Sequence, residues 1–446
     1  MTKSDLLKGN IKEIFFKFLI PSIGGMLGTS LYVLGDTMIV GRYLGNDGLV
    51  ALNLSIPIIN LYTGLGLLLG IGGATLMQVA KGRGEKENHS FFTLSIITAI
   101  TFGVILTLIR IFYIDDFVRF LGAEEHIFNL SKDYLKTLML FSIPFILNIC
   151  LTVYIRNDNA PKLAMAGMLI GSVLNVILDY IFIVIFKMGM MGGALATGIA
   201  PVISLLILSI HFIKRNNNIK LEFINLKIKE LINIFKTGFP SFIVELSHGI
   251  VIFAFNLVIL KEVGNIGVSA YTVIANLSLI VVAIFTGVSQ AIQPIVSINY
   301  GASNTKRYKD TLKLGIYTSF ILGLIFYLTG LLFPELLVSL FSHEKGEFLK
   351  ITKKGIQIYF LAFLVMGVNI VLTSYLQSKT FEKEALLVSL FRGLIINLIL
   401  LIILSNLFGL IGVWLTLFIT EIITIIISSI LFKTYKEGLI YTFKRS

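Results

Sequence analysis

The sequence predicts an all-helical membrane protein with twelve transmembrane helices in two six-helix lobes. Three observations support this fold class. The 446 residues have a mean hydropathy of +0.90, and 56% of them are hydrophobic against 14% charged, more apolar surface than a water-soluble domain could bury. Apolar runs of about 20 residues, the length needed to cross roughly 30 Å of hydrocarbon, recur along the whole chain. Landmarks of the first half return in the second half, which predicts two copies of one bundle.

Each expected span is an apolar run between more polar connections. In the first half the spans cover residues 14–40, 53–79, 91–113, 134–157, 163–186 and 191–213. In the second half they cover residues 231–260, 268–295, 311–333, 354–376, 385–405 and 409–432. We therefore expect an N-lobe over residues 1–213, a cytoplasmic linker over residues 214–230 and a C-lobe over residues 231–446.

The internal repeat is visible in prolines and glycines that interrupt or end helices. Pro21 returns as Pro240, and Gly82 returns as Gly301, at the same distance along the chain. Because each half has an even number of spans, the copies should share one orientation, related by a pseudo-two-fold axis along the membrane normal. Two parallel bundles of this kind can rock against each other and open a central cleft to either side, which favours a transporter over a channel.

The copies differ in charge. Asp36 corresponds to Phe255, and Asp179 corresponds to Leu401. The repeat thus preserves the scaffold, whereas the ionisable groups belong to one copy only.

The net charge of +12 follows the positive-inside pattern and does not predict nucleic-acid binding. With the N-terminus inside, most of the 37 Lys and Arg lie in inner loops and termini, so we expect both termini in the cytoplasm and the chain in the cytoplasmic membrane. The single cysteine, Cys150, excludes an internal disulfide and a thiol metal cluster. No cleavable signal is recognisable at the N-terminus, so the first span should be retained.

Four carboxylic acids fall inside expected spans: Asp36, Asp179, Glu245 and Glu421. A charge in hydrocarbon is costly, so each is a functional candidate. Counting 1.5 Å per residue from the inner helix ends places Asp36 and Asp179 both roughly 25 to 29 Å from the inner surface. These two side chains therefore share one level in the outer half of the expected N-lobe.

Two polar residues reach the same level. Asn175 lies one helical turn from Asp179 on the same face, and Thr197 returns to a comparable depth on the next span. Two aspartates in a low dielectric cannot both ionise cheaply, so we expect Asp36, Asn175, Asp179 and Thr197 to hold a proton, or Na⁺ at the same four residues. Capping or packing near a helix end is the alternative role for the aspartates.

No phosphate-binding loop and no room for a nucleotide-binding domain are present, so the expected energy source is an ion gradient. No cofactor is expected beyond H⁺ or Na⁺ as the coupling ion. The glycine-rich segment 64–73 lies inside an apolar span without a preceding strand, and predicts close helix packing rather than a dinucleotide loop.

At this point the chain resembles the multidrug and toxic compound extrusion (MATE) family, nearest to its DinF/MepA-like branch, over essentially its whole length. The resemblance rests on the segment 35–41 (GDTMIVG), Asn175 with Asp179 and Thr197, Pro240-Ser241, and the segment from Gln293-Pro294 to Asn299-Tyr300-Gly301. It implies two six-helix lobes that export amphipathic, mostly cationic drugs in exchange for protons or sodium. It also implies an ion site in the N-lobe and a first helix that bends at Pro21.

The second half departs from the pattern of the sodium-coupled branch. Its tenth span offers Asn369, Thr373 and Tyr375 but no carboxylate. We therefore expect no separate sodium site in the C-lobe and favour protons as the coupling ion. The chain should act as a monomer in the bilayer.

Further side chains inside spans are candidates for contact with substrate. They are Glu245, His248, Gln290, Asn369, Glu421, Tyr32, Met26 and Met366, with Phe255 and Tyr271 as further aromatic candidates. For His248 the alternative is a hydrogen-bonded structural role, and for Glu421 a buried hydrogen bond to a neighbour. Any single phenylalanine could equally face lipid.

Two other functions stay open. A flippase for lipid-linked oligosaccharides or peptidoglycan precursors would need several Lys or Arg in the cleft, and Arg392, near an inner helix end, is the nearest candidate. A membrane-embedded enzyme would need a catalytic motif, and neither H-E-x-x-H nor G-x-S-x-G occurs. We expect a transporter and not an enzyme.

Overall fold

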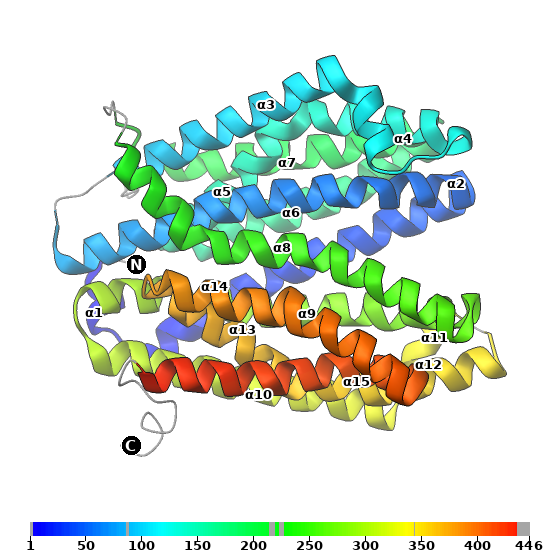
Figure 1. Cartoon of the computed structure of the whole chain (residues 1–446). Coiled ribbons are helices and arrows are strands. Elements are labelled where there is room, and N and C mark those ends of the chain that lie inside the picture. The colour runs from blue at the N-terminus through cyan, green and yellow to red at the C-terminus, as the bar shows by residue number, and fades with distance from the viewer. Residues whose placement is uncertain (1–2, 86–88, 214–218, 223–226, 343, 435–446) are drawn as a thin grey trace. The chain divides into compact units, whose positions relative to one another are not determined.

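The computed structural model describes residues 3–85, 89–213, 219–222, 227–342 and 344–434, and within these ranges it contains helices and no strand (Figure 1). The α-helices are α1 (Lys3–Lys8), α2 (Ile11–Arg83), α3 (Ser90–Phe120), α4 (Glu125–Leu138), α5 (Ser142–Asn157), α6 (Pro161–Asp179), α7 (Gly189–Ile213), α8 (Ile228–Val263), α9 (Asn265–Gly301), α10 (Thr305–Leu332), α11 (Pro334–Ser339), α12 (Glu347–Tyr359), α13 (Phe363–Ser378), α14 (Glu382–Leu390) and α15 (Ile396–Thr434). Short 3₁₀ turns, η1 (Met139–Phe141) and η3 (Phe360–Ala362), and π-helical turns, η2 (Tyr180–Ile185) and η4 (Phe391–Ile395), join some of them into longer helices.

Ten continuous helices in the described ranges are long and apolar enough to cross a membrane. Two of them turn back at a glycine: α2 at Gly45 (φ 70°, ψ −162°) and α15 at Gly409 (φ 56°, ψ −139°). Only glycine adopts these torsions without a steric cost, so each position ends one span and begins another. Counted in this way the chain has the expected twelve spans.

The repeat extends to backbone torsions. Gly264, the counterpart of Gly45, has φ 70° and ψ −160°. Asn159 (φ 64°) and Thr380 (φ 56°) form a second matched pair with positive φ. The two halves thus share turn geometry as well as sequence, and this supports their origin as copies of one bundle.

Several helices are longer than the apolar runs that predicted them. The span expected over residues 134–157 is a helix that begins at Glu125, and the one expected over residues 311–333 begins at Thr305. The end expected at residue 113 coincides with a kink in α3 at Tyr113 (φ −134°, ψ 22°). The extra turns carry polar residues, which hydropathy alone assigns to loops. The expected spans are therefore confirmed, but their boundaries were too short.

The helices form two compact units. Unit 1 comprises Met1–Lys8 and Ile20–Leu246, and unit 2 comprises Gly9–Leu19 and Ser247–Ser446. The chain passes from one unit to the other after Lys8, again inside α2 and a third time inside α8. Parts of the expected linker, residues 214–218 and 223–226, lie outside the described residues. The lobe limits expected from the sequence stay a prediction.

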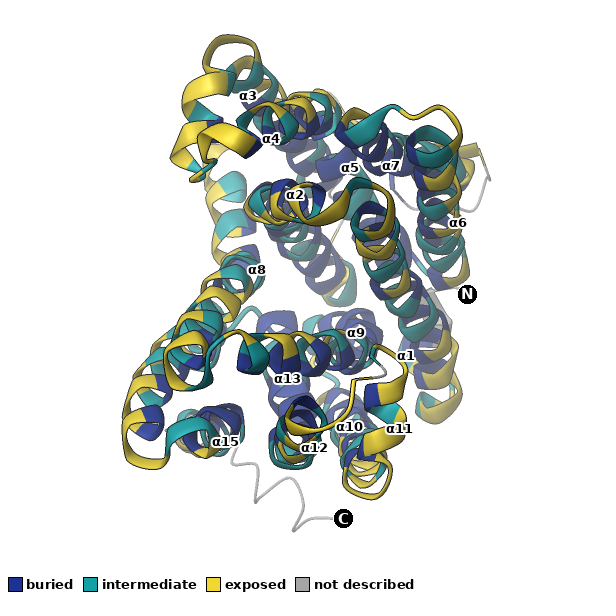
Figure 2. Cartoon of the chain, turned by 90° about the vertical axis from the view of Figure 1, so that its right-hand side faces the viewer, coloured by how far each residue is buried: buried dark blue, intermediate teal, exposed yellow. Residues whose placement is uncertain are grey.

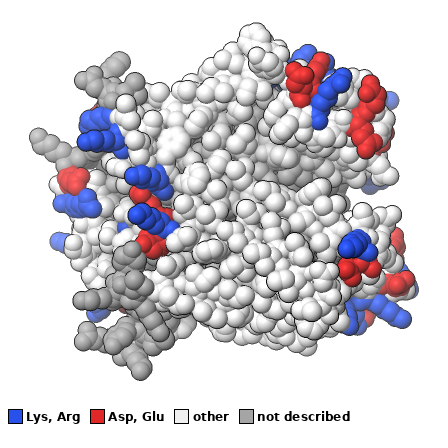
Figure 3. All heavy atoms as spheres, viewed as in Figure 1, with Lys and Arg blue, Asp and Glu red and all other residues white. Residues whose placement is uncertain are grey.

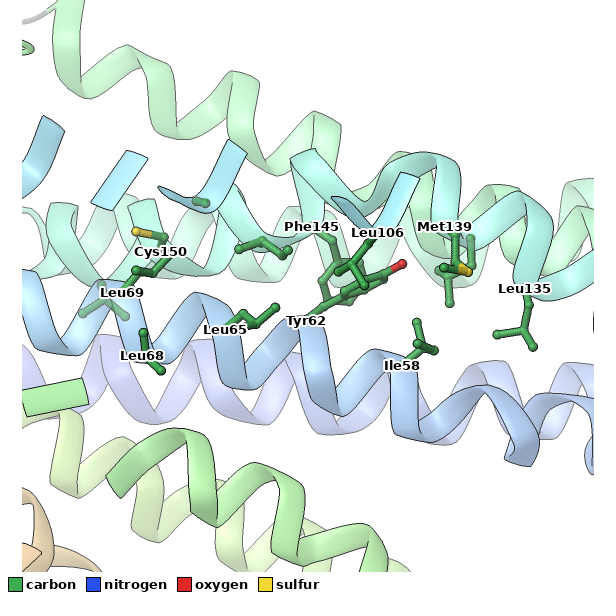
Figure 4. Packing of buried hydrophobic residues seen from close by; sticks show 14 of the residues in the cluster. Ile58, Tyr62, Leu65, Leu68, Leu69, Leu106, Leu135, Met139, Phe145 and Cys150 are labelled. Atoms are coloured by element: carbon green, nitrogen blue, oxygen red, sulfur yellow. The ribbon is translucent and has the colours of Figure 1, made fainter. Parts of the chain in front are cut away.

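Close packing around α5 forms the core of unit 1 (Figure 4). The Tyr62 hydroxyl and Ser142 Oγ share a hydrogen bond of 2.8 Å, and the ring of Tyr62 lies 5.2 Å from that of Phe145. A Cβ atom on Gly70 would lie 3.2 Å from the Cα of Cys150. The glycine-rich segment therefore allows helices to approach closely, as expected from the sequence.

The helices that surround the cores expose apolar side chains. Figure 2 shows exposed faces on α3 in unit 1 and on α10 and α15 in unit 2, where the exposed residues include Phe112, Ile321 and Ile402. On the face drawn in Figure 3, the charged side chains of each unit gather towards the helix ends and the surface between them is uncharged. An uncharged apolar belt of this kind suits contact with lipid.

Candidate functional site

The centre of the candidate site is a pair of aspartates in unit 1. Asp36, on the first part of α2, is 6% exposed, and Asp179, the last residue of α6, is fully buried. Their carboxyl groups lie within hydrogen-bonding distance of each other. A hydrogen bond between two carboxyl groups needs a proton, and two ionised groups at this distance would repel each other. The arrangement therefore requires a proton or another cation.

Asn175 and Thr197 complete the four residues that the sequence predicted to converge. The Asn175 amide can donate to Asp179 Oδ2 at 3.2 Å while its oxygen accepts from the Thr197 backbone N–H at 3.2 Å. In the opposite orientation its Nδ2 donates to Thr197 Oγ1 at 3.5 Å. Both residues are buried. The predicted convergence is present, and the role in ion coupling stays a prediction.

The two aspartates keep acceptor atoms that no described residue satisfies. Oδ1 of Asp36 and Oδ1 of Asp179 are buried and have no hydrogen-bond partner within the described ranges. A carboxylate oxygen can accept a hydrogen bond or bind a cation, so both atoms are available to a ligand of either kind. No group of three or more His, Cys, Asp or Glu that could hold a metal occurs in the part of the chain that the structure describes.

Tyrosines surround the pair, and one of them was missed by the sequence analysis. Tyr134 on α4 is fully buried close to both aspartates, and its hydroxyl lies 3.5 Å from Thr197 Oγ1. Tyr32, a predicted substrate residue, lies near the same carboxyl groups. Tyr134 marks the start of an expected span, where nothing in its spacing distinguishes it from an ordinary interfacial tyrosine.

Small residues hold α2 against the helix that carries Asp179. A Cβ atom on Gly25 would lie 2.8 Å from Met168 Sδ, and one on Gly28 would lie 2.6 Å from Leu169 Cδ2, both on α6. This close approach is what allows Asp36 and Asp179 to meet.

Pro21 and Met26 lie on the same part of α2. The only non-helical residue inside α2 is Gly45, so the backbone remains helical through Pro21. The chain passes between the two units at Leu19–Ile20, directly before this proline. Met26 is half-buried. The hinge at Pro21 and the substrate contact of Met26 stay predictions.

Glu245 and His248 lie on α8. Glu245 is half-buried beside Gly64 and Phe242, and forms no ion pair or hydrogen bond with the residues that the structure describes. His248 is exposed and belongs to unit 2, where it lies close to Arg392.

Unit 2 contains a buried ionic cluster. Arg392 Nε donates to Glu421 Oε1 at 2.9 Å and to Oε2 at 3.1 Å. Asn369 Nδ2 donates to Glu421 Oε2 at 2.7 Å and to its backbone oxygen at 2.8 Å. Glu421 thus has the hydrogen-bonded environment that was one of its two expected roles. Arg392, expected near an inner helix end, instead reaches a mid-span carboxylate, because it lies ten residues, about 15 Å, beyond the start of α14.

The remaining predicted substrate residues line the interior of unit 2. Met366 is 3% exposed inside its apolar core, and Gln290 on α9 is 9% exposed. Phe255 stacks on Tyr271 with ring centres 5.4 Å apart and planes 16° apart. Their contact with substrate stays a prediction.

Two further ionic groups lie near helix ends. Asp158 is fully buried, with His211 Nε2 at 2.8 Å and Lys81 Nζ at 3.9 Å. In unit 2, fully buried Lys379 lies among aromatic rings, 4.4 Å from the centre of Phe381 and 5.1 Å from that of Tyr375. Neither group was found from the sequence, because the partners come from distant helices.

Comparison with known proteins agrees with this architecture. The chain is 29% identical over 426 residues to "Multidrug export protein MepA" of Staphylococcus saprophyticus, covering 94% of this chain and 92% of the relative. It is 28% identical over 421 residues to the protein of the same name from Staphylococcus aureus, covering 93% and 92%. Both relatives are thus similar to this chain from end to end.

Solved structures show the same fold. One, described as the outward-facing conformation of a multidrug resistance MATE family transporter, has a TM-score of 0.90 at 24% identity and covers 100% of this chain and 99% of its own. Another, a MATE in the bent conformation, has a TM-score of 0.88 at 24% identity and covers 98% and 97%. These identities speak for the fold alone.

The profile of the MatE family matches residues 21–181 and 240–403, one segment in each half of the repeat. The two segments together include both aspartates of the pair, Asn175, and Arg392. The resemblance stated from the sequence is confirmed, and this multi-pass membrane protein belongs to the MatE family.

Proposed function

We propose that the chain is a cation-coupled antiporter that exports amphipathic, mostly cationic compounds by alternating access, driven by influx of protons or sodium. The family and the names of its relatives support multidrug export rather than catalysis. The observation that carries the coupling mechanism is the contact between the buried carboxyl groups of Asp36 and Asp179.

With one proton already shared between the two carboxyl groups, a cation entering from outside would neutralise the remaining negative charge of this pair. Once neutral, the pair no longer attracts a cationic drug, and the drug leaves on the same side. Release of the cation to the cytoplasm restores the negative charge and the attraction for the next drug molecule. Asn175 would orient the Asp179 carboxylate through its amide, which Thr197 holds in turn by its backbone N–H.

The ion gradient is large enough for this exchange. One charge that crosses 100 mV gains about 2.3 kcal/mol, and a tenfold concentration difference adds about 1.4 kcal/mol. One or two ions per cycle can therefore sustain accumulation ratios from tens to thousands. With one proton shared between the two carboxyl groups the pair carries one negative charge, so one further monovalent cation makes it neutral, in keeping with this stoichiometry.

We favour protons over sodium. Two carboxyl groups in contact form a proton-binding site without further ligands. A sodium ion needs several oxygens, and in one amide orientation the Asn175 oxygen already accepts a hydrogen bond from the Thr197 backbone N–H. In the second half, Glu421 is bound to Arg392, so it offers no free carboxylate for sodium.

Reconstitution tests the coupling ion. The full chain is placed in lipid vesicles, and uptake of the cationic dye ethidium into inside-out vesicles is followed under one gradient at a time. We expect uptake with a proton gradient in sodium-free buffer, and none when the proton gradient is collapsed at constant sodium. Uptake driven by a sodium gradient alone, with the pH difference held at zero, contradicts proton coupling.

We further propose that the transporter works as a monomer in the cytoplasmic membrane with both termini inside. Protease accessibility of tags at each end, in intact cells and in inverted membranes, tests this topology. Cleavage of either tag in intact cells contradicts it.

A further inference from the structure

The ionic cluster of unit 2 contains an arginine with unused hydrogen-bonding capacity. Arg392 binds Glu421 through Nε alone. A guanidinium group also carries N–H donors on Nη1 and Nη2, and within the described ranges none of these has an acceptor. The Arg392 side chain is 15% exposed, whereas that of Glu421 is 1% exposed. The open side of the cluster is therefore the cationic one.

Two features hold this open side in place. Arg392 lies on the π-helical turn η4, a local widening of the helix that often occurs at functional sites. Glu421 is fixed from its other side by two hydrogen bonds from Asn369. The guanidinium plane is thereby anchored at one edge, and its other edge remains available to a planar partner.

His248 adds a second donor. It is exposed and forms no hydrogen bond with the described residues. It lies on the part of α8 that packs against η4, since a Cβ atom on Gly393 would lie 3.4 Å from the Cβ of Ser247. A guanidinium edge beside an imidazole matches a carboxylate, which arginine binds through two parallel hydrogen bonds. A pyrophosphate carries more charge and needs several cations, and these two residues are the only basic groups in the cluster as the structure describes it.

We propose that Arg392, with His248 beside it, is a recognition subsite for the carboxylate of amphipathic substrates. This inference deepens the proposed function: the substrates then include zwitterions, which carry a carboxylate as well as a cationic group. Glu421 and Asn369 are positioning residues in this scheme, because they touch the guanidinium and not the substrate.

Binding to the purified full-length protein in detergent tests the subsite without any gradient. The probes are rhodamine B, which has a free carboxylate, and its methyl ester, which does not, and fluorescence polarisation gives both affinities. The measured quantity is the affinity for rhodamine B divided by the affinity for its methyl ester. We expect the double variant Arg392→Gln/Glu421→Gln, which leaves no unpaired charge, to lower this ratio at least about tenfold.

Two further variants make the result decisive. Glu421→Gln frees the whole guanidinium charge and should raise the ratio, an effect that a purely structural ion pair would not produce. Arg110→Gln removes an arginine of unit 1, whose Nε donates to the backbone oxygen of Lys136, and serves as the control with an unchanged ratio.

The inference is overturned if wild-type protein does not bind rhodamine B, or if its ratio survives in the double variant. It is also overturned if inorganic pyrophosphate displaces rhodamine B better than benzoate does, since that result indicates a phosphate-bearing lipid. A protein that transports no dye in vesicles but shows the expected ratios would contradict the proposed function and leave the subsite intact.

Discussion

The two halves of the repeat treat the same helix positions in opposite ways. In unit 1 the positions of Asp36 and Asp179 bring two carboxyl groups together. In unit 2 the corresponding residues are Phe255 and Leu401, each 1% exposed inside the apolar core. Asn397, the counterpart of Asn175, remains and has an unpaired buried oxygen. The scaffold of the site has been kept in unit 2, while its charge has been replaced by packing.

Unit 2 nevertheless buries an acid of its own, Glu421. The two units differ in the group that neutralises their buried acids. The guanidinium of Arg392, which is part of the chain, supplies the counter-charge of Glu421. The Asp36–Asp179 pair has no basic partner among the described residues, so in the proposed mechanism its counter-charge comes from solution. An exchangeable counter-charge can couple transport to an ion gradient. A counter-charge that belongs to the chain can stabilise the fold or bind a substrate group.

The largest expected effect is loss of the exchangeable charge. Asp36→Asn or Asp179→Asn should reduce drug export to the level of cells without the protein, because the pair can then no longer alternate between charged and neutral. Export is measured as dye efflux at matched expression. The double variant should be little worse than either single one, since the residues act as a unit.

Wild-type efflux from either single variant contradicts the ion site of unit 1. Loss of the protein from the membrane has to be excluded, so insertion and thermal stability are measured on the same samples.

Loss of the tethered charge should act on stability. Arg392→Ala leaves Glu421 buried and unpaired, a change that costs about 3–5 kcal/mol in other buried pairs. The thermal unfolding midpoint in detergent should fall clearly. Arg392→Gln/Glu421→Gln should recover most of the loss, because no buried charge remains. Equal midpoints for the single and the double variant would mean that Glu421 is not charged in the folded protein.

The prolines of the repeat allow a smaller and more selective test. Pro21 and its counterpart Pro240 each remove one helical hydrogen bond. Of the two helices that contain these prolines, only α2 carries a member of the aspartate pair, Asp36. Pro21→Ala should therefore reduce turnover more than substrate affinity, and Pro240→Ala should reduce turnover less than Pro21→Ala does. Dye uptake at several concentrations separates the two quantities. A collapse of affinity with normal turnover in Pro21→Ala contradicts the hinge.

The smallest effect on stability is expected for an exposed ion pair, which can be compared with the buried pair of Arg392 and Glu421. Lys353 Nζ donates to Glu335 Oε1 at 2.6 Å, and this hydrogen bond and the lysine charge lower the pKa of Glu335 below its ordinary value. The stabilisation is present above the unfolded pKa of about 4.3 and disappears as the pH falls through the lower folded value. Lys353→Gln should therefore lower the unfolding midpoint slightly at neutral pH and not at all in strong acid. A pH-independent effect contradicts this origin.

The sequence was sufficient for the helices and for the aspartate site. Apolar length gave the spans, and counting residues from the inner helix ends placed Asp36 and Asp179 at one level, where the structure brings them together. Depth along a helix follows from the rise per residue, so it can be counted.

The partners of Glu421 and the location of Tyr134 beside the aspartates could not be predicted by counting residues along a helix. Which face of a helix meets which neighbour depends on rotation and packing, and η4 changes the rotation locally by widening one turn. Arg392 was expected near a helix end because its span was predicted to begin at residue 385, whereas α14 begins at Glu382; its pairing with Glu421 depends on how the helices pack. For the same reason the aromatic surroundings of Lys379 were not foreseen.

The sharp reversal at Gly45 has a mechanical consequence. A single glycine links the two spans of α2, so no loop separates them. A tilt of the span that carries Asp36 would therefore also move the start of the next span. In the proposed mechanism, a movement that follows a change of charge on the aspartate pair would therefore be taken up at the other end of this span, near Pro21, where the chain changes unit.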